Sequence, residues 1–327
     1  MRYLTILLFI GLILPLKAQE SFFDHLHAKG DTVHLHFETE WKKLIRKKAN
    51  KTSFPLRMGV QRQDSVLSLP GKIRSRGNIR LEVCNNPSLK IKLKKDGLRK
   101  AGFSDLNDFK LVLQCSNGKV GESYLRREAL VYDLHRLYSG YTHRTIPVVI
   151  HFTDPKIDDI NAFFIEHEEQ LEARYNARIL KSKIASTRGL KRAPYINMCL
   201  FNYLVLNTDW HVFNLHNIEI INPLGTKDLV PIPYDFDYSG FVGTSYAIPR
   251  EELKISTVYS PKWLGKHVTE AEIKAGAAHF LSKSEEAEKL IQEHPTLTNS
   301  ARKRMLKRLE DFHKVLQKEK DLLRLIR

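Results

Sequence analysis

Strand-like and helix-like segments are segregated along this chain, and their order most constrains its fold. Short runs with alternating apolar residues extend from Phe54 to Leu93, with turns between them. Beyond Pro261 the apolar residues recur at helical spacing, ending in an amphipathic segment after Asn299. Strands followed by helices are typical of α+β proteins. We therefore expect an α+β fold with a β-rich N-terminal part and a mostly helical C-terminal part.

The composition indicates a folded protein with a strong positive charge. The chain has 327 residues, 42% of them apolar, which is enough for one large core or two modest ones. Lys and Arg outnumber Asp and Glu by 53 to 37, giving a net charge of +16. This charge favours anionic partners such as nucleotides, acidic proteins or envelope polyanions. No zinc-finger spacing or helix-turn-helix pattern stands out, so we do not expect nucleic acid as a partner.

The first residues have the pattern of a secretory signal. A basic start precedes an apolar run from Tyr3 to Leu16, and Ala18 provides a small residue at its exit. The run is shorter than the roughly 20 residues that cross a bilayer, which favours a cleaved signal over an uncleaved anchor. We expect a signal peptide at 1–18, a secreted or periplasmic protein, and no transmembrane span in the mature chain.

Three cysteines in an exported chain raise the question of disulfide bonding. Cys84 and Cys115 lie at the ends of strand-like runs that could be neighbours in the fold. A Cys84–Cys115 disulfide, with Cys199 left over, is one expectation in an oxidising compartment. Three free, buried thiols are the alternative.

Basic residues in the first half are candidates for holding a phosphate. Arg74 and Arg76 precede Gly77, where planar donors and close backbone approach suit a phosphate group, although a solvated hairpin turn has the same pattern. In the strand-like run that follows, Lys90 and Lys92 lie on the face opposite the apolar residues. Either lysine could therefore point at a ligand.

A helix expected from about Glu122 to Tyr138 carries Glu128 at the edge of its apolar stripe. Kinase-like folds use a strand lysine and a helix glutamate to fix the nucleotide phosphates. Lys90 or Lys92 with Glu128 is therefore the expected pair. A surface ion pair is the alternative.

Acids and carboxamides are concentrated between Asn207 and Asp237. A polar loop with Asp209 is expected to precede a strand that begins after Asn217, and a returning strand would present Asp235. The two ends of such a hairpin lie side by side. Phosphoryl transfer needs a carboxylate at the attacking hydroxyl and oxygen ligands for magnesium. Asp209 fits the first requirement, and Asn217 and Asp235 fit the second.

Other interpretations of this stretch remain open. His211 and His216 could bind zinc, but their five-residue offset and the lack of a third clear ligand make the pattern weak. The Asn and Asp side chains could instead cap local backbone in a polar turn. The sequence contains no serine-hydrolase elbow, P-loop or dinucleotide-binding glycine pattern.

The same stretch resembles a known family. The segments Asn207–Trp210, His216–Asn217 and Val230–Gly240 resemble the CotH-type spore-coat kinase family, and more closely a group of exported bacterial proteins that share its motifs. The turn Arg76–Asn78 and the lysine-bearing strand after it are similar to the N-terminal nucleotide-binding part of that family. The likeness covers about Gly71–Gly240.

The resemblance implies an atypical kinase. Its fold would be a two-lobed, protein-kinase-like fold with a β-rich nucleotide-binding lobe over 19–166 and a catalytic, mostly helical lobe over 167–327. Its cofactors would be ATP and Mg²⁺ or Mn²⁺. Its acceptor would be a hydroxyl on a protein or envelope molecule. The competing expectation is a pseudokinase-like binding module that uses a basic cleft for an anionic ligand.

The resemblance also implies roles for individual residues. Asp209 would be the catalytic carboxylate, and Asn217 and Asp235 would be the metal ligands, with Asp237 as a further one. HipA-type kinases place an asparagine five positions after their catalytic aspartate, which here selects Asn214 instead. Arg74, Arg76, Lys90, Lys92 and Glu128 would belong to the nucleotide-binding part.

Overall fold

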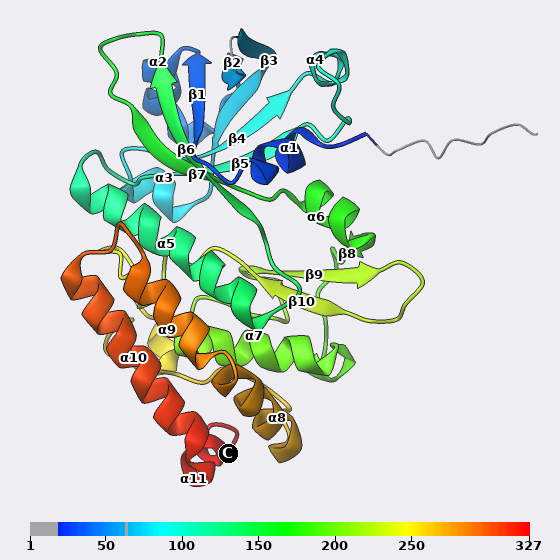
Figure 1. Ribbon diagram of the computed structural model, residues 1–327, viewed down its shortest axis with the longest axis vertical. Coiled ribbons are helices and arrows are strands. Elements are labelled where there is room, and N and C mark those ends of the chain that lie inside the picture. Colours follow the sequence, from blue (N-terminus) through cyan, green and yellow to red (C-terminus); the bar gives the residue numbers. More distant parts are fainter. Residues whose placement is uncertain (1–18, 63–64) are drawn as a thin grey trace, which may run out of the picture.

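Seven strands of the first half close into a β-barrel, in the upper part of Figure 1. The computed structural model describes residues 19–62 and 65–327, so the expected signal peptide lies outside the described residues. The strand order is β1-β2-β3-β4-β5-β7-β6, and a parallel β1–β6 pair closes it. The strands are β1 (Val33–Glu38), β2 (Phe54–Arg62), β3 (Ser65–Arg76), β4 (Ser88–Leu93), β5 (Asp108–Leu113), β6 (Thr145–Phe152) and β7 (Ile160–Ile165).

Alternation along the strands fills the barrel. In β1 the residues Val33, Leu35 and Phe37 are buried, and the residues between them are exposed. In β4 the leucines and Ile91 join the same core, whereas Lys90 faces outward, as the sequence pattern predicts. The barrel therefore has an apolar interior, and in β1 and β4 its outer face is polar.

Short helices cover the ends and sides of the barrel. Phe22, Phe23 and Leu26 of the first helix are buried in the barrel's core cluster, as is Trp41 of the second. These helices are α1 (Phe22–Ala28), α2 (Trp41–Arg46), the 3₁₀ turn η1 (Lys48–Asn50), α3 (Ile79–Val83) and α4 (Lys95–Lys100). The helix after β7, α6 (Glu168–Tyr175), packs instead against β8 of the second half.

The long helix α5 (Lys119–Tyr138) joins the barrel to the second half (Figure 1). Its apolar stripe shares one core with Val112 and Phe163 on the outer face of the barrel and with the C-terminal helices. Those helices are α7 (Arg192–Leu204), α8 (Glu270–Leu281), α9 (Ser284–Glu293), α10 (Asn299–Gln317) and α11 (Glu319–Arg324), with 3₁₀ turns η2 (Thr187–Gly189) and η3 (Glu251–Leu253).

A three-stranded antiparallel sheet lies in the second half. It consists of β8 (Ala177–Ile179), β9 (Ile218–Pro223) and β10 (Val230–Pro233), in the order β10-β9-β8. Strands β9 and β10 form the hairpin predicted from the sequence. Their end residues Ile218 and Pro233 are register partners, so Asn217 and Tyr234 continue the pairing just outside the strands.

The expected α+β class is correct, but the two-lobed protein-kinase-like fold with a mostly helical C-terminal lobe is wrong. The strands of the first half form a closed barrel, and the second half contains a sheet of its own. Closure depends on the pairing of β1 with β6. The alternation of apolar residues predicts β1 as a strand, but β6 lies more than a hundred residues away in the sequence. Local patterning does not encode such a pairing.

Two further expectations concern the cysteines and the membrane. Cys84 and Cys115 form a disulfide with their Cα atoms 4.7 Å apart, which confirms that pairing, and Cys199 is a free, buried thiol. The bond joins the end of α3 to the segment after β5. Among the described residues, none of the helices is long and apolar enough to cross a membrane.

Candidate active site

A cavity of about 330 Å³ lies between the outer face of the barrel, α5 and the β9–β10 hairpin. A larger cavity of about 1070 Å³ lies near Gly71 and is bordered by Lys92, but the acids of the central stretch do not line it. We take the smaller cavity as the candidate site because the carboxylates converge there. Among its lining residues are the expected Arg76, Glu128, Asp209, Asn217, Asp235 and Asp237.

Asp209 is held in place by the buried asparagines at the end of α7. The Asn207 side chain donates to Asn202 Oδ1 at 2.9 Å, and Asn207 Oδ1 accepts from the backbone N–H of Asp209 at 3.0 Å. Asn202 and Asn207 are each 1% exposed. Buried amides with satisfied hydrogen bonds fix the loop, so the position of Asp209 is set by the fold.

The carboxylate of Asp209 contacts two residues from the start of the hairpin. His216 Nε2 lies 3.0 Å from Oδ1, and Asn217 Nδ2 donates to Oδ2 at 3.0 Å. The Asp209 side chain is 22% exposed and that of His216 is 50% exposed. The carboxylate is thus oriented by the protein and still accessible from the solvent side.

The two ends of the hairpin adopt an uncommon backbone conformation. Asn217 has φ 53° and Asp235 has φ 61°, both in the left-handed region. Tyr234 N–H donates to the Asn217 carbonyl at 3.1 Å, and the Asp235 N–H donates to the Tyr132 hydroxyl at 2.9 Å. Such a conformation in Asp and Asn aims their side chains away from the strand direction, and it recurs at functional sites.

Asp237 and Glu128 are buried acids deeper in the cavity. Burial and the neighbouring Asp235 carboxylate raise the pKa of Asp237 to about 7. Burial, and then the charge of Asp237, raise the pKa of Glu128 well above its usual value. The Tyr246 hydroxyl donates to Asp237 Oδ2 at 2.8 Å. In this part of the site the charged forms of both acids are therefore disfavoured until a further cation compensates them.

The expected lysine–glutamate pair is not what the structure brings together. Lys90 and Lys92 both face Asp108, at 3.3 Å and 3.2 Å. Glu128 instead pairs with Arg80 of α3, whose Nη1 lies 3.5 Å away and 4.0 Å from Asp237. Arg80 lies in α3, directly after the turn at Gly77, and its guanidinium also donates to the carbonyl of Leu113 at the end of β5.

Two other expected residues lie away from the cavity. Arg74 Nη1 donates to the carbonyl of Ser75, and Asn214 Oδ1 lies 3.0 Å from His211 Nδ1 in the exposed loop. Neither borders the cavity, whereas Arg76 and Asn217 do. Of the two asparagines left open by the sequence, the geometry favours Asn217.

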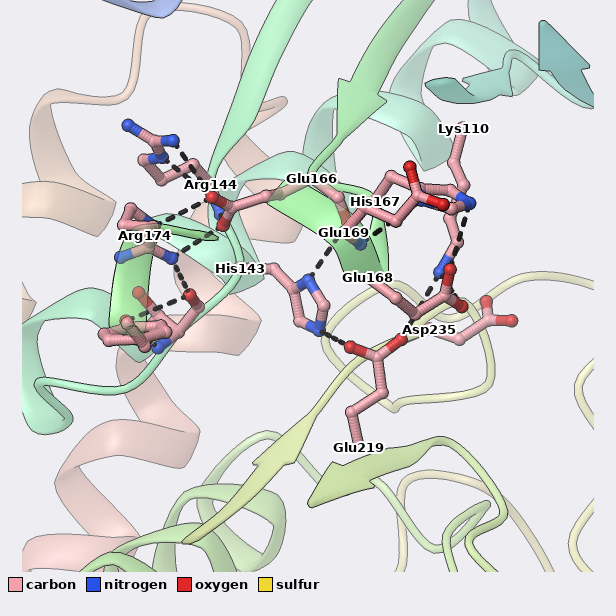
Figure 2. A network of polar contacts seen from close by, with 12 residues as sticks. Lys110, His143, Arg144, Glu166, His167, Glu168, Glu169, Arg174, Glu219 and Asp235 are labelled. Carbon is pink, nitrogen blue, oxygen red and sulfur yellow. Dashed lines mark hydrogen bonds and ion pairs between the residues drawn. The ribbon is translucent and has the colours of Figure 1, made fainter. Parts of the chain in front are cut away.

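Lys110 is a cavity residue that the sequence interpretation missed. It lies directly across from Lys90 in the β4–β5 pairing and is 7% exposed. Its Nζ lies 2.7 Å from Glu168 and 3.3 Å from Glu219, while His143 Nε2 lies 3.2 Å from the other Glu219 oxygen. Figure 2 shows His143 and Lys110 on either side of Glu219. A lone charge inside the apolar strand Asp108–Leu113 was the available signal.

The ion pairs of this network hold its acids in their charged form. Burial acts to raise the pKa of Glu168, but hydrogen bonds from His167 and Lys110 outweigh it and lower that pKa. Burial likewise opposes the charged form of Glu219, and His143 and Lys110 lower its pKa. The network links β5 of the barrel to β9 and α6, so it closes one wall of the cavity.

The residues present fit a hard divalent cation. The Asp235 carboxylate makes no hydrogen bond or ion pair with the other described residues, and Asn217 uses its amide nitrogen on Asp209, which leaves its oxygen available. No group of three His, Cys, Asp or Glu side chains in the described part of the chain could hold a metal ion as it stands. Mg²⁺ usually takes one or two carboxylates together with water and substrate phosphates, so a sparse set suits it.

The fold and the site were compared with known proteins. No protein-family model matches the chain, and no curated protein matches it. The family resemblance of the central stretch therefore remains an expectation carried by its motifs.

Proposed function

We propose that this protein is an exported phosphotransferase that moves a phosphoryl group from a magnesium-bound nucleotide to a hydroxyl on a protein or envelope molecule. The observation that carries the proposal is Asp209. Its carboxylate is fixed by His216 and Asn217 at the rim of a cavity that Asp235 and Asp237 also line, where Arg80 lies 4.0 Å from Asp237 and Asp235 has no ion pair with the other described residues. Phosphoryl transfer needs a positioned base next to a site that binds a divalent cation.

Asp209 would accept the proton of the attacking hydroxyl. Its carboxylate is held from two sides, so it orients the hydroxyl without reorganising, which is where much of the rate gain in phosphoryl transfer arises. His216 contacts the same carboxylate and is half exposed, which gives the proton a route to solvent. Asn217 keeps the second oxygen of Asp209 in place.

Asn217 and Asp235 would hold the cation, with Asp237 contributing charge. When bound, Mg²⁺ would neutralise the phosphate oxygens and the raised negative charge of the site. Asp235 is aimed by its left-handed backbone and by the N–H bond to Tyr132. These contacts keep the ligand oxygens in place before the nucleotide arrives.

Arg76 and Arg80 would bind the nucleotide phosphates. Both border the cavity, on either side of the turn at Gly77, which has φ 89°. A planar guanidinium binds phosphate oxygens in pairs, and glycine permits the backbone to approach them closely. Arg80 already compensates Glu128, so it supplies fixed positive charge at the cavity wall.

A binding module without transfer is the second candidate, and Lys110 is the observation that favours it. Its ammonium is already paired with Glu168 and Glu219, so it is not free to hold a phosphate in this arrangement. Lys90 and Lys92 are likewise paired with Asp108. A protein of this kind would bind an anion through Arg76 and Arg80 and, without a free lysine at the transferred phosphate, would leave the nucleotide intact.

Transfer of labelled γ-phosphate from ATP separates the two candidates. Wild-type protein should release phosphate to water or label an envelope fraction with Mg²⁺ present, and Asp209→Asn should lower that rate by a factor of about 10² to 10⁴, as expected for loss of a positioned base. Asp228→Asn, at a half-exposed ion pair in the hairpin turn, is the matched control and should retain the wild-type rate. Equal rates in Asp209→Asn and wild type would remove Asp209 from the mechanism.

A further inference from the structure

Three histidines meet on the outer face of the barrel, away from the proposed active site. His34 and His36 alternate with the buried residues of β1 and are exposed. His151 lies on β6, directly across from His36 in the parallel β1–β6 pair. Two positions apart on one strand and adjacent on the next, the three imidazoles share one face.

The rings are already in contact. His34 Nδ1 lies 2.9 Å from His151 Nε2, and the two rings are stacked with their centroids 5.2 Å apart. The ring of His36 stacks on His151 with centroids 5.0 Å apart. The other nitrogen of His151, Nδ1, lies 2.8 Å from Asp159 Oδ2. His151 is therefore oriented by a carboxylate, with Nε2 pointing at its neighbour.

We propose that His34, His36 and His151 form a binding site for Zn²⁺, with Asp159 orienting His151. A carboxylate that accepts from one imidazole nitrogen fixes the tautomer and leaves the lone pair of the other nitrogen for a metal. Imidazole ligands suit zinc and are a poor match for Mg²⁺, which prefers oxygen. This site is thus chemically distinct from the proposed nucleotide site and independent of it.

Small ring movements would complete the site. As the side chains stand, no described group of three forms a metal site. Two nitrogens bound to one tetrahedral Zn²⁺ lie about 3.3 Å apart, by the usual Zn–N distance, so the pair at 2.9 Å needs to open slightly. The third nitrogen comes from rotation of the exposed His36 ring. Its β2 partner is Gly59, where an added Cβ would lie 3.3 Å from His36 Cβ, so glycine leaves room for that rotation.

A metal ion at this location would connect the two strands that close the barrel. The β1–β6 pair closes the barrel, and it is the parallel pair among the barrel's strand pairs. A zinc ion held by both strands would bridge this closure from outside, opposite the apolar side chains that fill it from within. Binding to the folded state alone would then stabilise the barrel in proportion to zinc concentration.

Calorimetric titration of ZnCl₂ into the metal-free full chain tests the proposal. We expect binding to the wild type that is weakened at least about tenfold in His36→Ala and His151→Ala, and about 10- to 100-fold in Asp159→Asn, the range for a residue that orients a ligand. His211→Ala, from the other histidine pair, should bind as the wild type does. Thermal melts without zinc check that the variants are folded. If His151→Ala is unstable, the comparison of His36→Ala with the wild type is decisive, because His36 is exposed and its replacement should not affect folding.

Two outcomes would overturn the proposal. One is zinc binding that is absent in the wild type or equal in His36→Ala and the wild type. The other is binding lost only in His211→Ala, which would place the ion at the hairpin loop. Neither outcome bears on nucleotide transfer, because Mg²⁺ and ATP take no part in this titration.

Discussion

Two clusters of acids lie beside the same cavity, and their pKa values are shifted in opposite directions. Glu128 and Asp237 line the cavity, whereas Glu168 and Glu219 are joined to it through Lys110. In the first, contacts with Lys110, His167 and His143 hold the pKa values of Glu168 and Glu219 low. In the second, burial and the charge of Asp235 raise the pKa of Asp237, and burial and the charge of Asp237 raise the pKa of Glu128. One guanidinium, that of Arg80, faces both carboxylates there, at 3.5 Å from Glu128 and 4.0 Å from Asp237.

The opposite pKa shifts distinguish a cluster whose ion pairs stabilise the fold from a cluster that is suited to binding a cation. A buried acid with its own cation is already satisfied, and removing that cation costs stability. A buried acid without a sufficient cation has a raised pKa until a cation binds. Such perturbed pKa values are one way in which binding sites are recognised. The following substitutions exchange acid for amide at both clusters.

The largest expected effect is the loss of Glu219. Glu219→Gln leaves Lys110 and His143 without their shared charge in a buried position, and breaking such a pair costs about 3 kcal/mol. Urea unfolding followed by circular dichroism measures this. A midpoint equal to that of the wild type would show that the network contributes nothing to stability.

The next effect concerns the cation. Asp235→Asn replaces a charged ligand by a neutral one, so the Mg²⁺ concentration needed for half-maximal nucleotide binding should rise on the order of tenfold. Titration of MgCl₂ at fixed ATP, followed by the melting temperature, provides the measurement. Asp228→Asn serves again as the control, and an unchanged Mg²⁺ requirement in Asp235→Asn would exclude Asp235 as a ligand.

Asp237→Asn should change the free energy of unfolding in the opposite direction from Glu219→Gln. The change removes a buried charge that repels Asp235, and an amide can still accept from Tyr246. Without metal we therefore expect a free energy of unfolding equal to that of the wild type or slightly higher. Destabilisation comparable to that of Glu219→Gln would mean that the two clusters do not differ.

The smallest effect is a change in acid sensitivity. The folded pKa of Glu168 is depressed below the ordinary 4.5, so its contribution to stability is present above that pH and is lost as pH falls below it. Glu168→Gln should consequently flatten the loss of stability between neutral pH and pH values below about 4.5. Melting temperatures across a pH series test this, and parallel curves for the two proteins would contradict it.

Local features of the site could be predicted from the sequence. The hairpin, its turn and the juxtaposition of Asn217 with the residues after β10 followed from two apolar runs separated by a turn. Asp209 and the Cys84–Cys115 bond were likewise anticipated, because each lies beside a recognisable strand or helix end.

Features that depend on distant pairing could not be predicted. The barrel closes only when β1 pairs with β6, which is distant in the sequence. Glu128 pairs with Arg80 and not with Lys90 or Lys92 of β4. Lys110 was missed because its cross-strand neighbour Lys90 has the same residue type and a clearer alternation. Which of two outward lysines reaches a cavity is decided by the helices packed over the sheet.

The most direct test of the central claim is the melting temperature of the full chain with ATP and Mg²⁺, with ATP and a chelator, and alone. If the under-compensated acids await a magnesium nucleotide, the melting temperature should rise only when both are present, since a ligand at 100 times its Kd adds about 2.7 kcal/mol of stability. Asp235→Asn should lose most of that rise. No shift with any magnesium nucleotide, or the same shift in the chelator, would contradict the account.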